Sequence, residues 1–158
     1  MNCIVAQSGG PTAAINASLA GVVASARDFG IYDKIYGAIH GIQGVLKKHF
    51  LDLSDKDDAF IHQLARTPAM YLGSCRFKLP DMNEDVSMYE EIFSIFKEMN
   101  IGAFFYIGGN DSMDTVAKLS AYAASIDNDI RIIGVPKTID NDLIMTDHTP
   151  GFGSAAKY

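Results

Sequence analysis

The sequence predicts an α/β domain with a mostly parallel sheet and helices on both faces. Short apolar runs alternate along the chain with segments in which apolar residues recur every three or four positions, which is typical of strands alternating with helices. The run Ala103–Ile107 is apolar without alternation, as expected of a strand buried on both faces. The chain has 158 residues, of which 48% are hydrophobic and 20% charged, enough for one domain with its own core.

The first part of the chain is predicted to place a long helix between two strands. A strand is expected over Asn2–Gln7, followed by a turn at Ser8–Thr12. Apolar residues then recur at helical spacing over Ala13–Phe29, which predicts a helix. The next strand is expected over Lys34–Ile39, and His40–Gly44 after it is a loop or the start of a short helix.

The middle of the chain is predicted to hold two helices joined by a compact loop. Leu51–Arg66 begins with a charged patch, most simply the solvated N-terminus of a helix. Leu72–Phe77 is a compact loop with an arginine in a Gly/Ser setting. Asn83–Asn100 is expected to be a helix with an apolar stripe facing the core, and Ser87 and Glu90 in it have the spacing of a capping box.

The last part of the chain continues the alternation. Asp111–Ile126 carries apolar residues at helical spacing, and Arg131–Val135 is predicted to be the next buried strand. A last helix opens at Ser154–Tyr158. The whole pattern predicts a Rossmann-like three-layer domain, in which right-handed crossovers bring the carboxyl ends of the strands, where such folds bind ligands, to one edge.

The composition argues against several classes of function, among them nucleic-acid binding and membrane insertion. Thirteen Lys and Arg against nineteen Asp and Glu give a formal net charge of −6, so no general surface for nucleic acid or anionic membrane is expected. Two isolated cysteines, Cys3 and Cys75, give neither a metal spacing nor a disulfide framework. With short apolar runs and no basic segment before the first strand, neither a signal peptide nor a membrane span is expected, and a cytoplasmic location is predicted.

Three polar clusters follow predicted strands, so the fold would bring them to the same edge. They are Ser8–Thr12, Gly108–Ser112 and Pro136–Asp142. Two of them contain Gly-Gly turns, whose backbone N–H groups favour an anion such as phosphate at a helix N-terminus. Arg76 and Lys137 add positive charge. Taken alone, the Gly108–Ser112 cluster also fits an ordinary strand-to-helix connection, which stays open as an alternative.

The same clusters supply carboxylates for a metal ion or a proton, namely Asp111, Asp140 and Asp142. Phosphoryl transfer needs three things together: N–H groups that bind phosphate, positive charge, and a base. No Gly-x4-Gly-Lys-Ser/Thr loop is present, so the chain is not a P-loop enzyme. Taken alone, Asp140 also fits an Asx-turn residue.

These motifs closely resemble the 6-phosphofructokinases, in particular the pyrophosphate-dependent branch. The resemblance rests on Ser8-Gly9-Gly10 through Asn16, on Gly108–Ser112 and on Pro136–Asp142, which occur in family order and spacing along almost the whole chain. It implies a transferase of glycolysis that moves a phosphoryl group from pyrophosphate to the 1-hydroxyl of D-fructose 6-phosphate, giving fructose 1,6-bisphosphate.

The resemblance also implies residue roles on the sugar side. Asp140 would be the base that accepts the proton of the 1-hydroxyl, with Thr138 and Asp142 beside the sugar and the transferred group. Asp111 and Lys137 would complete the catalytic set and choose the donor, because ATP-dependent relatives typically have glycine at both positions. A carboxylate at position 111 would repel a nucleotide α-phosphate, and the ammonium group at position 137 would neutralise pyrophosphate.

On the donor side, the resemblance implies that five residues hold the phosphates: Gly10, Arg76, Gly109, Asn110 and Ser112. The cofactor implied is Mg²⁺, with Asn110 and Asp111 as its candidate ligands. Asn110 departs from the family, most of which has a metal-binding aspartate there. An amide oxygen ligates Mg²⁺ without bringing charge.

The resemblance covers only the first part of a family member. The chain, 1–158, is therefore expected to be a single N-terminal domain that binds the phosphoryl donor and is truncated inside its last helix. Because the Met-Gly-Arg segment and later sugar-gripping residues are missing, the fragment alone is expected to be inactive. The full-length parent is expected to be a homo-oligomer with small-molecule substrates and no nucleic-acid or membrane partner.

Three alternatives stay open. The donor could be ATP, within the same enzyme class. The chain could instead be a non-catalytic phosphate- or nucleotide-binding module, although the presence of Asp140 counts against this. A dinucleotide-dependent dehydrogenase is weaker, because neither Gly-Gly turn completes Gly-x-Gly-x-x-Gly.

Overall fold

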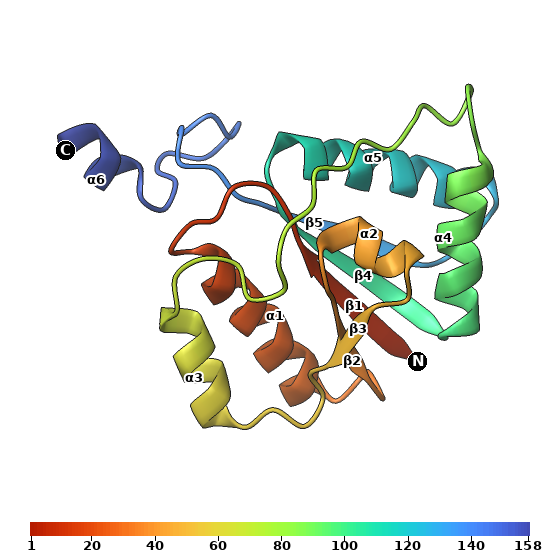
Figure 1. Cartoon of the computed structure of the whole chain (residues 1–158), viewed down its shortest axis with the longest axis horizontal. Coiled ribbons are helices and arrows are strands. Elements are labelled where there is room, and N and C mark those ends of the chain that lie inside the picture. The colour runs from red at the N-terminus through yellow and green to blue at the C-terminus, as the bar shows by residue number, and fades with distance from the viewer.

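The computed structural model describes all 158 residues, which fold around a five-stranded sheet of order β3-β2-β1-β4-β5 (Figure 1). Strands β1, β2, β4 and β5 are parallel, and β3 pairs antiparallel with β2. The strands are β1 (Asn2–Gln7), β2 (Ile35–Ala38), β3 (Phe50–Asp52), β4 (Ile101–Gly108) and β5 (Arg131–Pro136). The predicted α/β fold with a mostly parallel sheet is confirmed.

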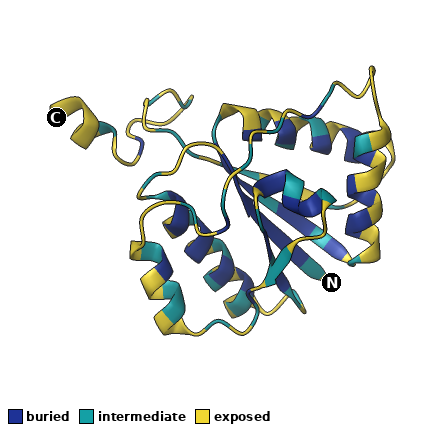
Figure 2. Cartoon of the chain, viewed as in Figure 1, coloured by how far each residue is buried: buried dark blue, intermediate teal, exposed yellow.

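Helices cover both faces of the sheet and make it the middle of three layers. The helices are α1 (Ile15–Phe29), α2 (Gly41–Leu46), α3 (Asp58–Arg66), α4 (Ser87–Glu98), α5 (Asn110–Ser125) and α6 (Phe152–Lys157). One apolar cluster joins the sheet to α1 and α3, and a second joins it to α2, α4 and α5. Helix α6 lies apart from these layers and is mostly exposed (Figure 2).

Strand β1 and most of β4 are apolar because helices cover both of their faces, and only Gly102 and Phe105 of β4 are half-buried. In β4, Phe104 and Tyr106 join the cluster beneath α4 and α5, whereas Ala103 and Ile107 join the cluster beneath α1. Full burial of a side chain the size of Phe104 contributes about 1.5–3 kcal/mol to stability. The absence of alternation in this segment is therefore explained by helices on both sides of the sheet.

Three local predictions were wrong. Strand β5 was predicted to be buried, whereas none of its residues is buried, because no helix covers the face that borders an apolar hollow beside α1. Strand β3 was missed, because the segment Leu51–Arg66 was read from its first residue as the approach to a helix, whereas that helix begins only at Asp58. The capping box in α4 does not form: the Ser87 hydroxyl donates to the Asp85 carboxylate at 2.7 Å and does not cap the helix. The carboxylate two residues upstream competes successfully for the serine.

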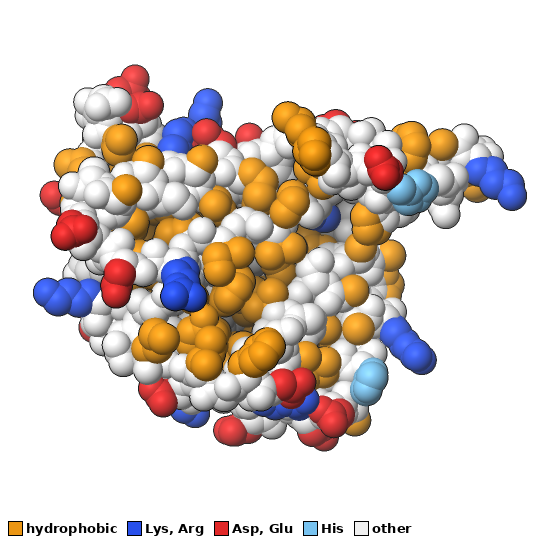
Figure 3. Space-filling view, turned by 180° about the vertical axis from the view of Figure 1, so that it is seen from behind, with side chains coloured by type: hydrophobic (Ala, Val, Ile, Leu, Met, Phe, Trp, Pro, Cys, Tyr) orange, Lys and Arg blue, Asp and Glu red, His pale blue; other side chains and the backbone are white.

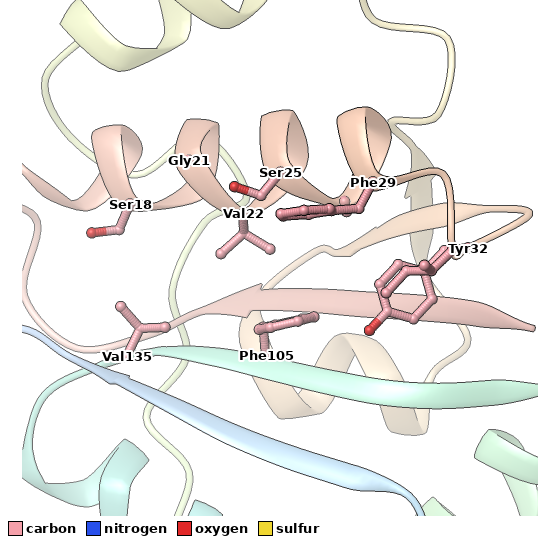
Figure 4. A pocket seen from close by; sticks show the side chains of 10 residues that line it. Ser18, Gly21, Val22, Ser25, Phe29, Tyr32, Phe105 and Val135 are labelled. Atoms are coloured by element: carbon pink, nitrogen blue, oxygen red, sulfur yellow. The ribbon is translucent and has the colours of Figure 1, made fainter.

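One part of the sheet has no helix over it. On the face that carries α1, strands β4 and β5 border an apolar hollow of about 420 Å³ (Figure 4). Phe105 and Val135 form its floor, and Val22 and Phe29 of α1 form its wall. Apolar side chains gather in the corresponding part of the surface (Figure 3). No helix of the chain combines the length and the hydropathy that crossing a membrane requires.

Candidate active site

The carboxyl ends of β1, β4 and β5 meet at one edge of the sheet. Their register pairs Gln7 with Ile107 and Gly108 with Pro136. Just beyond these ends lies a cavity of about 920 Å³, lined by the segments Ser8–Pro11, Ser74–Lys78 and Gly109–Ser112. The lining is mostly polar, in contrast to the hollow beside α1.

The two Gly-Gly turns touch each other at the rim of this cavity. Gly9 has φ +82°, and a Cβ atom on it would lie 3.3 Å from the backbone nitrogen of Gly109. A Cβ atom on Gly108 would lie 2.2 Å from the hydroxyl oxygen of Ser112. A larger residue at position 9 would press against the second turn, and one at position 108 would collide with Ser112, so glycine at both positions allows this close packing.

The second turn leads into α5, whose N-terminus opens on the cavity. Its N-cap residue is Gly109, which offers no side chain to the free N–H groups of the first turn. Asn110 and Asp111 in that turn are exposed and line the cavity, whereas Ser112 is buried. The positive end of the helix dipole therefore faces the cavity, with one carboxylate beside it.

A buried polar network fixes the loop that carries Arg76. The Gln7 side-chain amide donates to Asn16 Oδ1 at 3.1 Å, and its oxygen accepts from the Leu72 N–H at 2.9 Å. Asn16 Oδ1 also accepts from the Tyr71 N–H at 2.9 Å. Because Gln7 and Asn16 are buried, these bonds hold the loop with little competition from water.

The same loop is bonded to the first Gly-Gly turn. The Ser8 hydroxyl donates to the Cys75 carbonyl at 3.0 Å, and the Ser74 hydroxyl donates to the Gly9 carbonyl at 2.8 Å. Arg76 and Lys78 follow directly, and both side chains are exposed and line the cavity. The loop thus presents two positive charges to the space in front of α5.

Lys137 connects the third cluster to the other two. Its backbone N–H donates to the Gly108 carbonyl at 2.8 Å, and its Nζ donates to the Gly10 carbonyl at 3.0 Å. The side chain therefore crosses from the end of β5 to the turn after β1. It joins the three clusters that the sequence predicted to meet.

The residues predicted for the sugar side lie beyond the cavity. The cavity is not lined by Thr138, Asp140 or Asp142, which follow Lys137 in the sequence. The carboxylates of Asp140 and Asp142 are exposed. The Asp140 N–H donates to the Thr138 hydroxyl at 3.0 Å, which orders the backbone before the carboxylate. The structure thus brings together Gly10, Arg76, Gly109, Asn110, Asp111 and Ser112 around one cavity and leaves the sugar-side residues on an open segment.

A family model described as Phosphofructokinase matches residues 2–158. The chain belongs to the phosphofructokinase family.

Within the phosphofructokinase family, the chain is similar to proteins named pyrophosphate–fructose 6-phosphate 1-phosphotransferase. The one from Rhodospirillum rubrum is 49% identical over 155 residues, which are 98% of this chain and 37% of that protein. The one from Xanthomonas campestris is 47% identical, over 99% of this chain and 37% of that protein. The chain thus spans little more than a third of the length of these relatives.

A solved structure from the same family agrees with the fold. The crystal structure of a pyrophosphate-dependent phosphofructokinase from Nitrosospira multiformis superposes with a TM-score of 0.88 at 46% identity. The superposition covers 99% of this chain and 38% of that one. The three-layer arrangement is therefore shared with the matched 38% of that phosphofructokinase.

The side-chain oxygens at the cavity suit a Mg²⁺ ion that is bound by the protein and a phosphate ligand together. The protein has no cluster of three His, Cys, Asp or Glu side chains that could hold a metal by itself. It offers the Asp111 carboxylate and the Asn110 amide oxygen on adjacent residues at the cavity. Mg²⁺ in phosphoryl-transfer sites is commonly bound by one or two protein oxygens together with substrate phosphates and water, so these residues fit the ion.

Sequence reasoning overlooked Lys78 and the structural role of Gln7. Lys78 stands two residues after Arg76 in the same loop, so its charge could have been noticed as a second cation there. Gln7 was read only as the end of a strand, and its partners are up to 65 residues away in the sequence. No local pattern indicates such a contact.

Proposed function

We propose that the chain is the phosphoryl-donor-binding domain of a pyrophosphate-dependent 6-phosphofructokinase. The observation that carries the proposal is the cavity at the sheet edge, which Arg76 and Lys78 line together with the N-terminus of α5. Pyrophosphate is a compact polyanion, and backbone N–H groups with flanking cations are the groups that bind it. The names of the relatives from Rhodospirillum rubrum and Xanthomonas campestris support the same donor.

The charge distribution favours pyrophosphate over ATP. Asp111 lines the donor cavity, where a carboxylate would repel the additional phosphate of a nucleotide. Lys137 Nζ lies 3.0 Å from the Gly10 carbonyl oxygen, within reach of the same space. Its ammonium group would compensate charge on a donor that has no nucleoside to anchor it.

The chain's own residues then divide the chemistry. Arg76, Lys78 and the first turn of α5 would bind and orient the donor. Asp140 would take the proton of the sugar 1-hydroxyl while the oxygen of that hydroxyl forms its bond to phosphorus. The bond from phosphorus to the bridging oxygen breaks, and inorganic phosphate leaves. Mg²⁺ would supply charge neutralisation at the donor phosphates, held by Asp111 and Asn110.

The sugar-binding half of such a site would come from outside this chain. Thr138 and Asp142 would contact the sugar phosphate only when further parts of the protein hold it in place, because their segment is open to solvent. Assembly of the full-length protein into a homo-oligomer and its location in the cytoplasm are further predictions, and so is its role in glycolysis.

The proposal is tested with a full-length protein that contains this domain. Formation of fructose 1,6-bisphosphate is measured with Mg²⁺ and either pyrophosphate or ATP as donor, and Asp140→Asn is the matched inactive control. We expect pyrophosphate to be used with much higher kcat/KM than ATP. A preference for ATP would favour the alternative donor, and no turnover with either would favour a binding module without chemistry.

A further inference from the structure

We infer that Asn141 is a positioning residue that holds the segment bearing Asp140 in its working shape. This inference rests on the proposed function, because it assigns a purpose to the order of the segment around the base. Asn141 lies directly between Asp140 and Asp142, and its side chain points back to its own segment, where it makes two hydrogen bonds.

The backbone of Asn141 is left-handed. Its φ is +58°, a conformation that costs most residues energy and that asparagine and glycine tolerate best. Asparagine is therefore a suitable residue at this point for its backbone alone, and any test has to separate the backbone from the side chain.

The side-chain amide closes a loop. Asn141 Oδ1 accepts from the Thr149 N–H at 2.9 Å, and Nδ2 approaches the Asp147 carbonyl oxygen at 3.4 Å. Thr149 is 1% exposed, so the shorter of the two bonds ends on a buried residue. One side chain thus ties both ends of the segment 141–149 together.

The other polar contacts of this segment are local. The Asp140 N–H bonds to Thr138, and the Thr146 N–H bonds to the Leu143 carbonyl at 3.3 Å. Neither contact links the two sides of the loop. The Ile139 side chain lies near Gly151, but it is 42% exposed, so the Asn141 amide is the contact that closes the loop.

Positioning of this kind bears on turnover more than on donor binding. Asp140 lies on the open segment, whereas the donor cavity is lined by three other segments. Loosening the loop would leave the cavity intact and displace the carboxylate from the hydroxyl that it deprotonates. A misplacement of about 1 Å costs roughly a hundredfold in rate.

The test uses three variants of the full-length protein. Asn141→Gly keeps the left-handed backbone and removes the amide, and Asn141→Asp keeps an oxygen that accepts from Thr149. Asn100→Gly is the control, because Asn100 is also left-handed, with φ +51°, but lies between α4 and β4 at the opposite edge of the sheet. Turnover, pyrophosphate KM and hydrogen exchange of the Thr149 amide are measured for each.

We expect Asn141→Gly to lower kcat roughly ten- to a hundredfold and to change the pyrophosphate KM by less than about twofold. Its Thr149 amide should exchange faster, whereas Asn141→Asp should keep that amide protected and recover part of the turnover. Asn100→Gly should match the unchanged protein in all three measurements, because it alters an equivalent backbone far from the site.

Two results would overturn the inference: equal exchange of the Thr149 amide with and without the Asn141 side chain, or full turnover in Asn141→Gly. A fall in turnover accompanied by lost pyrophosphate binding would also overturn it, because that pattern indicates general unfolding. If the unchanged protein shows no turnover, the proposed function fails and the catalytic part of the inference fails with it. The exchange measurement still decides whether Asn141 orders the loop.

Discussion

The donor side and the sugar side of the candidate site are built differently. On the donor side, the loop before Arg76 is bonded to two buried side chains and to the first Gly-Gly turn. On the sugar side, the segment after Lys137 is bonded mostly to itself and is largely exposed (Figure 2). With the roles proposed above, the residues that would bind the donor are held by the fold of this chain, whereas those that would bind the sugar lie on a segment with few contacts to the rest of the domain.

The largest expected effect is the loss of catalysis in the chain by itself. The purified 158-residue chain should bind pyrophosphate weakly with Mg²⁺ in calorimetry and form no fructose 1,6-bisphosphate. Positioning of the acceptor accounts for about 7–11 kcal/mol of such a barrier, and the open segment cannot provide it. Sugar phosphorylation at a rate near that of the full-length protein would erase the distinction between the two sides.

The next effect concerns the base. In the full-length protein, Asp140→Asn should lower turnover by roughly a hundredfold or more while leaving pyrophosphate binding nearly unchanged, because only the proton acceptor is lost. The control is Asp129→Asn, which makes the same change at an exposed position before β5. Steady-state kinetics separate kcat from KM. Near-normal turnover in Asp140→Asn would remove that residue from the role.

The donor cradle is tested by its two loop cations. Arg76→Ala and Lys78→Ala should each weaken pyrophosphate binding by about tenfold or more, since a hydrogen bond to a charged group contributes about 1.5–3 kcal/mol. Lys97→Ala, an exposed lysine at the end of α4, is the control. Calorimetric titration measures each dissociation constant. If the dissociation constant is unchanged in Lys78→Ala, Lys78 does not contribute to pyrophosphate binding, and only Arg76 and the N-terminus of α5 would remain as binding groups.

The smallest expected effect is a change of donor. Asp111→Gly combined with Lys137→Gly removes the repulsive carboxylate and the compensating ammonium group. In the full-length protein it should lower kcat/KM for pyrophosphate and allow some use of ATP, shifting the ratio of the two by about tenfold. The measurement is kcat/KM for each donor. A protein that prefers ATP before any substitution would refute the role given to Asp111.

Much of the fold could be predicted because its signals are local. The uninterrupted apolar run of β4, the glycines after it and the helical spacing of α5 lie next to each other in the sequence and agree with the structure. Strand β3 could not be recognised, because its three residues depend on pairing with β2. The spacing of Ser87 and Glu90 indicated a capping box, but it could not show that the Ser87 hydroxyl bonds to the Asp85 carboxylate instead.

For the candidate site, the sequence identified the residues within motifs but not the contacts between distant parts of the chain. Positions such as Gly10, Asn110 and Asp140 were reached through motifs, and the structure adds that the first two face one cavity and the third does not. The buried bonds of Gln7 could not be read from the sequence, since their partners are distant along the chain. The roles of all these residues stay predictions until the variants are measured.

The two thiols of the chain offer a means of observing the donor cavity in solution. Burial raises the pKa of Cys3 to about 12, so it stays protonated and shielded from thiol reagents. Cys75 is only half-buried and lines the cavity beside Arg76. Of the two thiols, Cys75 should therefore react first with a small thiol reagent, and an anion bound in the cavity should slow that reaction.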